Sequence, residues 1–197
     1  NKIKECVSRV KELGMNSVAI TDHGVMFGVI DFYRAAKAAG IKPILGCEVY
    51  VAPGSRFDKE AVGNNDDRYY HLVLLAENET GYYNLMKIVS RGFTEGYYYK
   101  PRVDMELLEQ YHEGIIALSA CLAGEVQRNL VRGMYEEAKE VAYRYERCFG
   151  KGNFFLELQD HGIPEQKLVN QQLLRMSQET GIELVATNDV HYTNAED

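Results

Sequence analysis

Acidic, imidazole and thiol side chains follow the predicted strands of this chain at several places. The clearest case is residues 18–24, VAITDHG, where three apolar residues lead directly into Thr21, Asp22 and His23. Parallel α/β enzymes build their sites from polar side chains at the ends of strands. The alternative is a helix N-cap at Thr21 or Asp22 with His23 in solvent, and this motif alone does not decide between the two.

The same pattern recurs further along the chain. The polar side chains at or near the ends of later predicted strands are Glu48, Cys121, Asp160, His161, Asp189 and His191. In a barrel the carboxyl ends of the strands converge on one face, so these side chains would meet around one cleft. Imidazole, carboxylate and thiol groups together suit Zn, Mn or Fe. Two or three such ions can hydrolyse phosphoesters, because they generate hydroxide at neutral pH and neutralise charge on the phosphoryl oxygens.

These positions differ in how strongly each one indicates a metal ligand. Glu48 lies among apolar residues of its strand, and a carboxylate there favours a functional role. Asp189 and His191 would project from the same side of an extended strand, which suits two ligands of one metal centre, although an exposed turn is nearly as common for this spacing. Cys121 has the alternative of being a small buried apolar residue, by far the usual state of a free cysteine.

The remaining histidines fit this scheme less well. His71 stands at the start of the predicted strand 69–76, away from its carboxyl end, so strand position alone predicts a structural role. We interpret His161 as a donor that stabilises its loop rather than as a ligand. His112 falls at a predicted helix end and is expected to be solvated.

The elements that must position these side chains follow from hydrophobic period and from Gly and Pro. Predicted strands cover 18–21, 44–51, 69–76, 115–118, 154–158 and 183–186. Predicted helices cover 3–13, 27–39, 79–93, 103–111, 124–131, 134–149 and 164–180, and residues 52–68 are predicted to form a long surface loop. Strands alternating with helices predict a parallel α/β architecture, preferably a barrel of about seven strands, with a doubly wound sheet as second choice. Because the chain opens on a helix, the first barrel strand is expected to be missing from this sequence.

Composition narrows the class of protein. The 197 residues predict one domain over residues 1–197, with 46% hydrophobic and 26% charged residues, as in soluble globular proteins. The four cysteines show no CxxC pairing, so reduced thiols and a cytoplasmic location are expected. The net charge of -7 argues against general nucleic-acid binding by this region. No apolar run is long enough for a membrane helix, and no nucleotide-binding loop is present.

Residues 96–102, GYYYKPR, allow two interpretations. Tyrosines beside Lys and Arg suit stacking on a single-stranded nucleic acid. Tyrosine-rich loops more often pack at a domain interface, and the rest of the chain is acidic. The sequence therefore favours the interface.

Six segments taken together resemble a known family. They read AITDHG, KPILGCEVYVAPGSR, YYHLVLLAEN, LSACLAGEV, FFLELQDHG and ATNDVHY, in this order along essentially the whole chain. The set is similar to the PHP (polymerase and histidinol phosphatase) domain found at the N-terminus of bacterial DNA polymerase III alpha subunits. GCEVYVAPGSR and NDVHY match this replicative branch better than they match the free-standing phosphatases.

The resemblance implies a β/α barrel whose cleft holds up to three divalent metals, often Zn, and which is a 3'–5' exonuclease in some members and a scaffold in others. The implied metal ligands are His23, Glu48, His71, Cys121, Asp189 and His191, so His71 returns to the site. Asp22 would support a ligand, and a hydroxide on the metal would be the nucleophile. The implied partners are a DNA 3' end, the polymerase domains and other replicase subunits.

One motif of the family is absent. Its HxH on the first strand, followed by an acidic residue, would lie before Asn1 and would supply several ligands. We therefore expect a depleted metal site and weak or no hydrolysis from the chain as written. The rival functions are a free-standing phosphoesterase acting on a small ester such as histidinol phosphate, and a non-catalytic scaffold of the polymerase.

Overall fold

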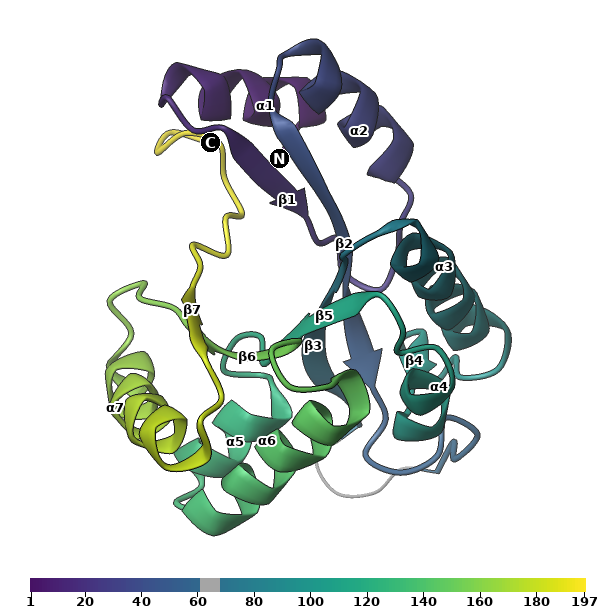
Figure 1. The fold of residues 1–197 in the computed structure, drawn as a ribbon, viewed down its shortest axis with the longest axis vertical. Coiled ribbons are helices and arrows are strands. Elements are labelled where there is room, and N and C mark those ends of the chain that lie inside the picture. Colours follow the sequence, from purple (N-terminus) through teal and green to yellow (C-terminus); the bar gives the residue numbers. More distant parts are fainter. Residues whose placement is uncertain (61–67) are drawn as a thin grey trace.

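The computed structural model describes residues 1–60 and 68–197, and residues 61–67 of the predicted 52–68 loop lie outside the described residues. It shows an α/β architecture with one curled sheet and helices packed around its outer face (Figure 1). The strands are β1 Ser17–Ile20, β2 Lys42–Val51, β3 Tyr70–Ala76, β4 Arg102–Val103, β5 Ile115–Leu118, β6 Phe154–Leu158 and β7 Leu184–Ala186. The helices are α1 Ile3–Glu12, α2 Val29–Ala38, α3 Glu79–Thr94, α4 Met105–Gln110, α5 Glu125–Val131, α6 Tyr135–Phe149 and α7 Pro164–Thr180.

The predicted elements agree closely with these bounds. Every predicted helix and strand is present, and β4 is the one described strand that the hydrophobic pattern did not indicate. Local signals explain the agreement. Asp104 ends the extended chain and caps α4 by accepting a hydrogen bond from the Leu107 backbone at 3.0 Å, and Pro164 occupies the first turn of α7.

The sheet runs in the order β1-β2-β3-β5-β6-β7, with β4 paired to β2. Most neighbours are parallel, but β3 is antiparallel to both β2 and β5. The α/β barrel-like class is confirmed, and the prediction of an all-parallel sheet is wrong at β3. Among residues 52–60 and 68–69, the described part of the connection between β2 and β3, there is no helix, and antiparallel neighbours need no crossover helix.

The main core lies between the outer face of the sheet and helices α3 to α7. Along β2 the buried Cys47, Val49 and Val51 face this core. Because strand side chains alternate, Glu48 and Tyr50 point to the opposite, inner face. Each large apolar side chain fully buried in this layer contributes about 1.5–3 kcal/mol, so the outer layer fixes β2 and thereby the direction of Glu48.

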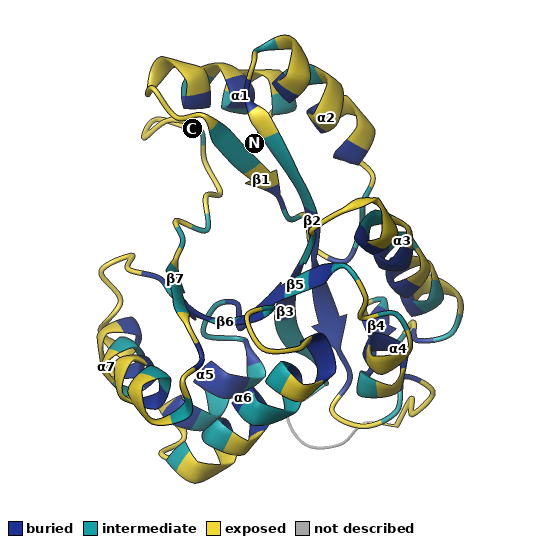
Figure 2. Cartoon of the chain, viewed as in Figure 1, coloured by how far each residue is buried: buried dark blue, intermediate teal, exposed yellow. Residues whose placement is uncertain are grey.

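Helices α1 and α2 pack on β1 through a second, smaller cluster that includes Val7, Val10 and Phe32. In Figure 2 the buried residues gather along the sheet and the inward sides of the helices, while the segment after β7 is mostly exposed. That segment returns to the beginning of the chain (Figure 1). Asn1 Nδ2 donates to the Val190 carbonyl at 3.1 Å, and Thr193 Oγ1 donates to Asn1 Oδ1 at 2.9 Å.

Candidate metal centre

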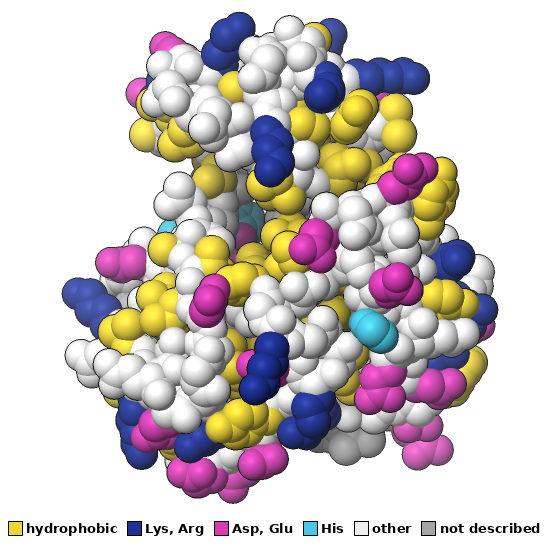
Figure 3. All heavy atoms as spheres, in the orientation of Figure 1, with side chains coloured by type: hydrophobic (Ala, Val, Ile, Leu, Met, Phe, Trp, Pro, Cys, Tyr) yellow, Lys and Arg dark blue, Asp and Glu magenta, His cyan; other side chains and the backbone are white. Residues whose placement is uncertain are grey.

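Three of the predicted site residues form a compact group. Candidate ligand atoms of His23, Glu48 and His71 all lie within 4.8 Å of one another. His71 Nδ1 is 2.6 Å from Glu48 Oε1, and His23 Nε2 is 3.7 Å from Glu48 Oε2. The space-filling view shows histidine and acidic side chains inside the hollow at the waist of the molecule (Figure 3). The carboxylate therefore stands between two imidazoles.

Backbone pairing beyond the end of β1 places His23. The Glu48 amide donates to the Asp22 carbonyl at 3.0 Å, and the Gly24 amide donates to the Glu48 carbonyl at 2.9 Å. His23 therefore forms an isolated parallel bridge with Glu48. The predicted N-cap alternative placed His23 in the first turn of a helix, whereas the bridge keeps it beside β2.

The direction of β3 places His71. Its register pairs Tyr50 with His71 and Glu48 with Val73, so His71 is a diagonal neighbour of Glu48 on the same face. Since β3 is antiparallel, its first residues lie at the edge where β2 ends. The structural role that strand position predicted for His71 assumed a parallel β3, and that premise is wrong.

Cys121 approaches the group from the turn after β5. Its Sγ lies 3.5 Å from His71 Nδ1 and 4.0 Å from Glu48 Oε1. The preceding Ala120 has φ +65°, a left-handed conformation that costs a non-glycine residue free energy, and strained residues of this kind cluster at functional sites. The turn is docked on β3 because the His71 amide donates to the Ala123 carbonyl at 3.1 Å.

Asp189 and His191 lie in the segment after β7. The ring centroids of His191 and His23 are 6.2 Å apart, so His191 borders the group. His191 Nδ1 is 2.8 Å from the carbonyl oxygen of Asp189, and the Asp189 carboxylate lies outside the three-residue group. The prediction that an extended strand would present both side chains on one side is wrong, because β7 ends at Ala186 and Asp189 has φ +44°.

The polar residues after β6 stabilise loops. His161 Nε2 is 2.8 Å from the Asn188 carbonyl oxygen, and its Nδ1 is 3.0 Å from Gln166 Nε2, which agrees with the predicted loop-stabilising role. Asp160 Oδ1 accepts a hydrogen bond from the Gly162 amide at 3.1 Å and joins no ligand group. His112 is exposed, as expected.

Asp22 is exposed, and its carboxylate points toward the start of α2, where a Cβ on Gly28 would come within 3.3 Å of Oδ2. Its backbone carbonyl, rather than its side chain, contacts β2, by accepting from the Glu48 amide and from Cys47 Sγ. A supporting role for the Asp22 carboxylate therefore stays a prediction.

The His71 imidazole lies against a carboxylate and a thiol, and both contacts favour its charged form. Burial lowers the pKa of His71, but its contacts with Cys121 and Glu48 outweigh burial and raise the pKa to about 9. A carboxylate oxygen of Glu48 and the sulfur of Cys121 lie beside His71 Nδ1, and His23 adds a second imidazole to the group. This donor set fits a borderline divalent metal such as Zn.

Two tyrosines that the sequence reasoning missed enclose the histidines. The Tyr50 ring is 5.3 Å from the His71 ring and 6.3 Å from the His23 ring, and Tyr69 stacks on His71 at 6.1 Å. Desolvation raises the pKa of Tyr50. Strand alternation was the available signal, because Tyr50 is two residues from Glu48 and Tyr69 two residues from His71.

Glu157 was also missed. It is buried on β6, accepts hydrogen bonds from Thr187 Oγ1 and Gln159 Nε2, and has its pKa raised by desolvation. It lines a cavity of about 10 Å³ next to Cys121, room for about one water. Glu157 Oε2, Gln159 Oε1 and Gln127 Oε1 have no protein partner there.

Comparisons with known proteins agree with this fold. The PHP domain family model matches residues 1–161. The DNA polymerase III alpha subunits of Treponema pallidum and Deinococcus radiodurans are 50% and 46% identical over the whole chain, which spans 17% and 15% of their lengths. A crystal structure from Bifidobacterium adolescentis, described as a candidate metal-dependent phosphoesterase, is 13% identical with a TM-score of 0.55, covering 98% of this chain and 83% of that one.

A second solved structure, an amidohydrolase from Chromobacterium violaceum with bound sulfate and no metal, is 14% identical with a TM-score of 0.59. The match covers 99% of this chain and 84% of that one. At these identities the two structures support the fold alone. Among the described residues no helix is both long enough and apolar enough to cross a membrane.

Proposed function

The chain belongs to the PHP domain family, and on that premise we propose that its cluster of imidazole, carboxylate and thiol groups is the metal-binding part of a phosphoesterase site. The proposed ligands are His23, Glu48, His71, Cys121, Asp189 and His191. The observation that carries the proposal is the grouping of a buried carboxylate with two imidazoles and a thiol from four separate segments of the chain. Buried carboxylates are costly without a cationic partner, and a divalent ion is one.

The chemistry of such a site divides between the ion and the protein. A bound divalent ion, Zn or else Mn or Fe, supplies an activated water at neutral pH and neutralises charge on the phosphoryl oxygens. Glu48 orients His23 and His71 from between them. Tyr50 lies beside both imidazoles and Tyr69 beside His71, so the two tyrosines cover part of the imidazole surface.

The substrate we propose is a DNA 3' end, removed by 3'–5' exonuclease action. Support comes from the polymerase III alpha subunits that are 44–50% identical over the whole chain or nearly all of it. Since the chain spans 17% of the Treponema relative, DNA-directed DNA polymerase activity, a cytoplasmic location and partners among polymerase domains and replicase subunits are proposed for the full-length protein.

The test uses the full-length protein and two histidine variants, H71A and the matched surface control H112A. We expect Zn or Mn at near stoichiometry in the wild type and in H112A, and its loss in H71A, by elemental analysis. Nucleotide release from a mismatched primer end should follow the metal. A folded protein that binds no metal would support the scaffold instead. A metal-loaded protein that cleaves histidinol phosphate and leaves the primer intact would support the small-molecule phosphoesterase.

A further inference from the structure

Residues 97–101 and Arg68 form an aromatic and basic rim beside the metal centre, and we propose that this tyrosine rim (Arg68, Tyr97, Tyr99 and Lys100) binds a single DNA strand. The strand's bases would stack on the tyrosine rings, and its phosphates would pair with the two cations. The inference rests on the proposed function, and it names the residues that choose a polynucleotide over a small phosphate ester.

Lys100 and Pro101 place the rim against the cluster. Lys100 Nζ lies 5.7 Å from the centre of the Tyr50 ring, and that ring is 5.3 Å from the His71 ring. On the other side, a Cβ added to Gly24 would come within 3.0 Å of Pro101 Cγ. Gly24 has φ +69°, a left-handed conformation that favours glycine, and the absence of a side chain also allows Pro101 to approach closely. Gly24, the residue after His23, therefore packs against Pro101, the residue that follows Lys100 of the rim.

Arg68 and Tyr99 form the second part of the rim. The Arg68 guanidinium lies 3.9 Å above the Tyr99 ring, a cation–π contact. Arg68 directly precedes Tyr69, whose ring stacks on His71. Tyr97 and Tyr99 are 52% and 60% exposed, so about half or more of each residue is accessible to a ligand. A continuous path of contacts thus runs from the metal cluster to Lys100, Arg68 and the exposed Tyr99 ring, and Tyr97 lies two residues before Tyr99.

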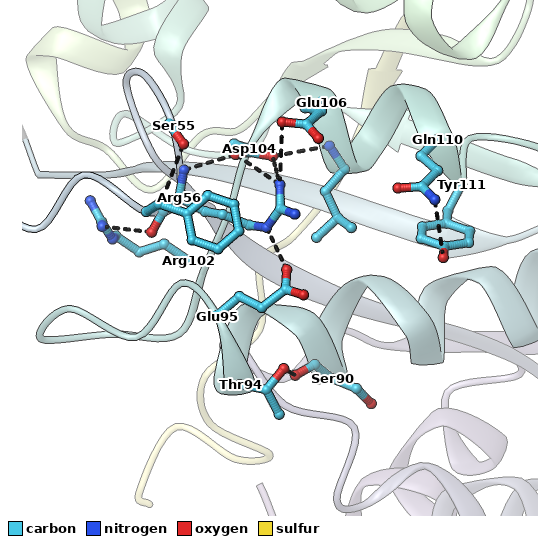
Figure 4. A network of polar contacts seen from close by, with 12 residues as sticks. Ser55, Arg56, Ser90, Thr94, Glu95, Arg102, Asp104, Glu106, Gln110 and Tyr111 are labelled. Carbon is cyan, nitrogen blue, oxygen red and sulfur yellow. Dashed lines mark hydrogen bonds and ion pairs between the residues drawn. The ribbon is translucent and has the colours of Figure 1, made fainter.

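A buried network holds the rim in place (Figure 4). Arg102, 3% exposed, donates from Nε to the Gly96 carbonyl at 3.2 Å and from Nη2 to the Asp58 and Arg56 carbonyls at 2.7 and 3.3 Å. Arg56 in turn pairs with Asp104 at 3.0 Å. Both ends of residues 97–101 are therefore anchored, so binding orders few groups and loses little conformational entropy.

The chemistry of the rim selects a single strand. Every base has a π-face that can stack on tyrosine, and Lys and Arg beside the rings neutralise the phosphates. In a duplex the base faces are covered by their neighbours, so stacking on the rim requires an unpaired end. The sequence alone favoured a domain interface for this stretch; its place on the lip of a proposed hydrolytic site favours the strand.

The first experiment needs no hydrolysis. The full-length protein is irradiated, in EDTA, with a single-stranded oligodeoxynucleotide carrying 5-iodouracil at its 3' end, and cross-links are mapped by mass spectrometry. We expect cross-links to the tyrosines of residues 97–99, and at least a fivefold loss of them in the double variant R68A/K100A. Absence of cross-links to these tyrosines, or an unchanged cross-linking yield in the double variant, would overturn the proposal that the rim binds DNA, even if the metal site hydrolyses DNA.

The second experiment separates strand binding from chemistry. Y99A should raise the KM for a single-stranded oligonucleotide about fivefold to a hundredfold, the range seen when one stacking side chain is removed. Turnover of bis(p-nitrophenyl) phosphate, which has no strand to bind, should stay unchanged. Tyr83 is an exposed tyrosine on α3, and Y83A is the matched control. This variant should leave both the KM for the oligonucleotide and the turnover of bis(p-nitrophenyl) phosphate unchanged. The proposal would be contradicted if Y99A and Y83A changed the KM for the oligonucleotide equally, or if Y99A lost activity on both substrates.

Salt dependence gives a third readout. Removing Lys100 should reduce the slope of log KM against log salt by about 0.7, the value for one phosphate contact on a single strand. An unchanged slope in K100A would show that Lys100 makes no phosphate contact. If the wild type binds and cross-links the strand but hydrolyses nothing, the proposed function fails and the rim stands.

Discussion

Asp104 is the residue whose removal should most disturb the support of the rim. Asp104 is 2% exposed, and its carboxylate accepts four hydrogen bonds (Figure 4). Three come from Arg56, from its amide at 2.8 Å and from Nη1 at 3.0 and 3.1 Å. The fourth comes from the Leu107 amide at 3.0 Å and caps α4. The variant D104A removes the acceptor for all four and leaves a buried guanidinium.

The expected loss follows from these contacts. Breaking a buried ion pair by removing one partner costs about 3–5 kcal/mol, because the other charge stays buried. A lost N-cap costs about 1 kcal/mol. Arg56 keeps Glu95, whose Oε2 lies 2.7 Å from Nε, so the sum is partly offset. We expect the free energy of unfolding to fall by about 4 kcal/mol, and the melting temperature by about 8–16 °C for a chain of this size.

The assay is urea unfolding followed by circular dichroism, with E106A as the matched control. Glu106 also faces Arg56, at 3.8 Å, but its side chain is 74% exposed. Exposed ion pairs contribute little, so E106A should cost less than about 0.5 kcal/mol. If D104A costs less than about 1 kcal/mol, the buried pair does not anchor this part of the chain and the reasoning is refuted.

Three further predictions concern other parts of the fold. Burial raises the pKa of Glu157 above its ordinary 4.5, so ionisation destabilises the folded state; E157Q should melt higher than wild type at pH 7, and scans at several pH values should show the difference vanishing below pH 4.5. In α3, a Cβ on Gly81 would overlap the Gly114 carbonyl, whereas the nearest atom to one on Gly92 is the side-chain atom Val103 Cγ1 at 3.3 Å, with Arg102 backbone atoms at 3.7 Å; G81A should lower the melting temperature by several degrees and G92A should not. C121A should weaken zinc binding at least tenfold by competition with a chromogenic chelator, while C148A, in the main core, should leave it unchanged.

Local physics explains what could be predicted from the sequence alone. Hydrophobic period, caps and breakers depend on neighbours within a few positions, so the helices and all strands but β4 are where the pattern indicates. The same local logic marks His23 and Glu48: a strand that runs into Asp-His, and a carboxylate inside an apolar strand, are unusual in any fold. The class of site was therefore predictable before its geometry.

Tertiary structure decided which candidate site residues come together, because their proximity depends on which strands are neighbours and in which direction those strands run. The antiparallel β3 brings His71 to Glu48, and no property of residues 69–76 themselves encodes that direction. Asp189 and His191 lie after the end of β7, in a segment whose path depends on contacts with Asn1, nearly two hundred residues away in sequence. The tyrosine rim likewise became part of the site only through packing, since Gly24 and Pro101 meet although no local pattern relates them.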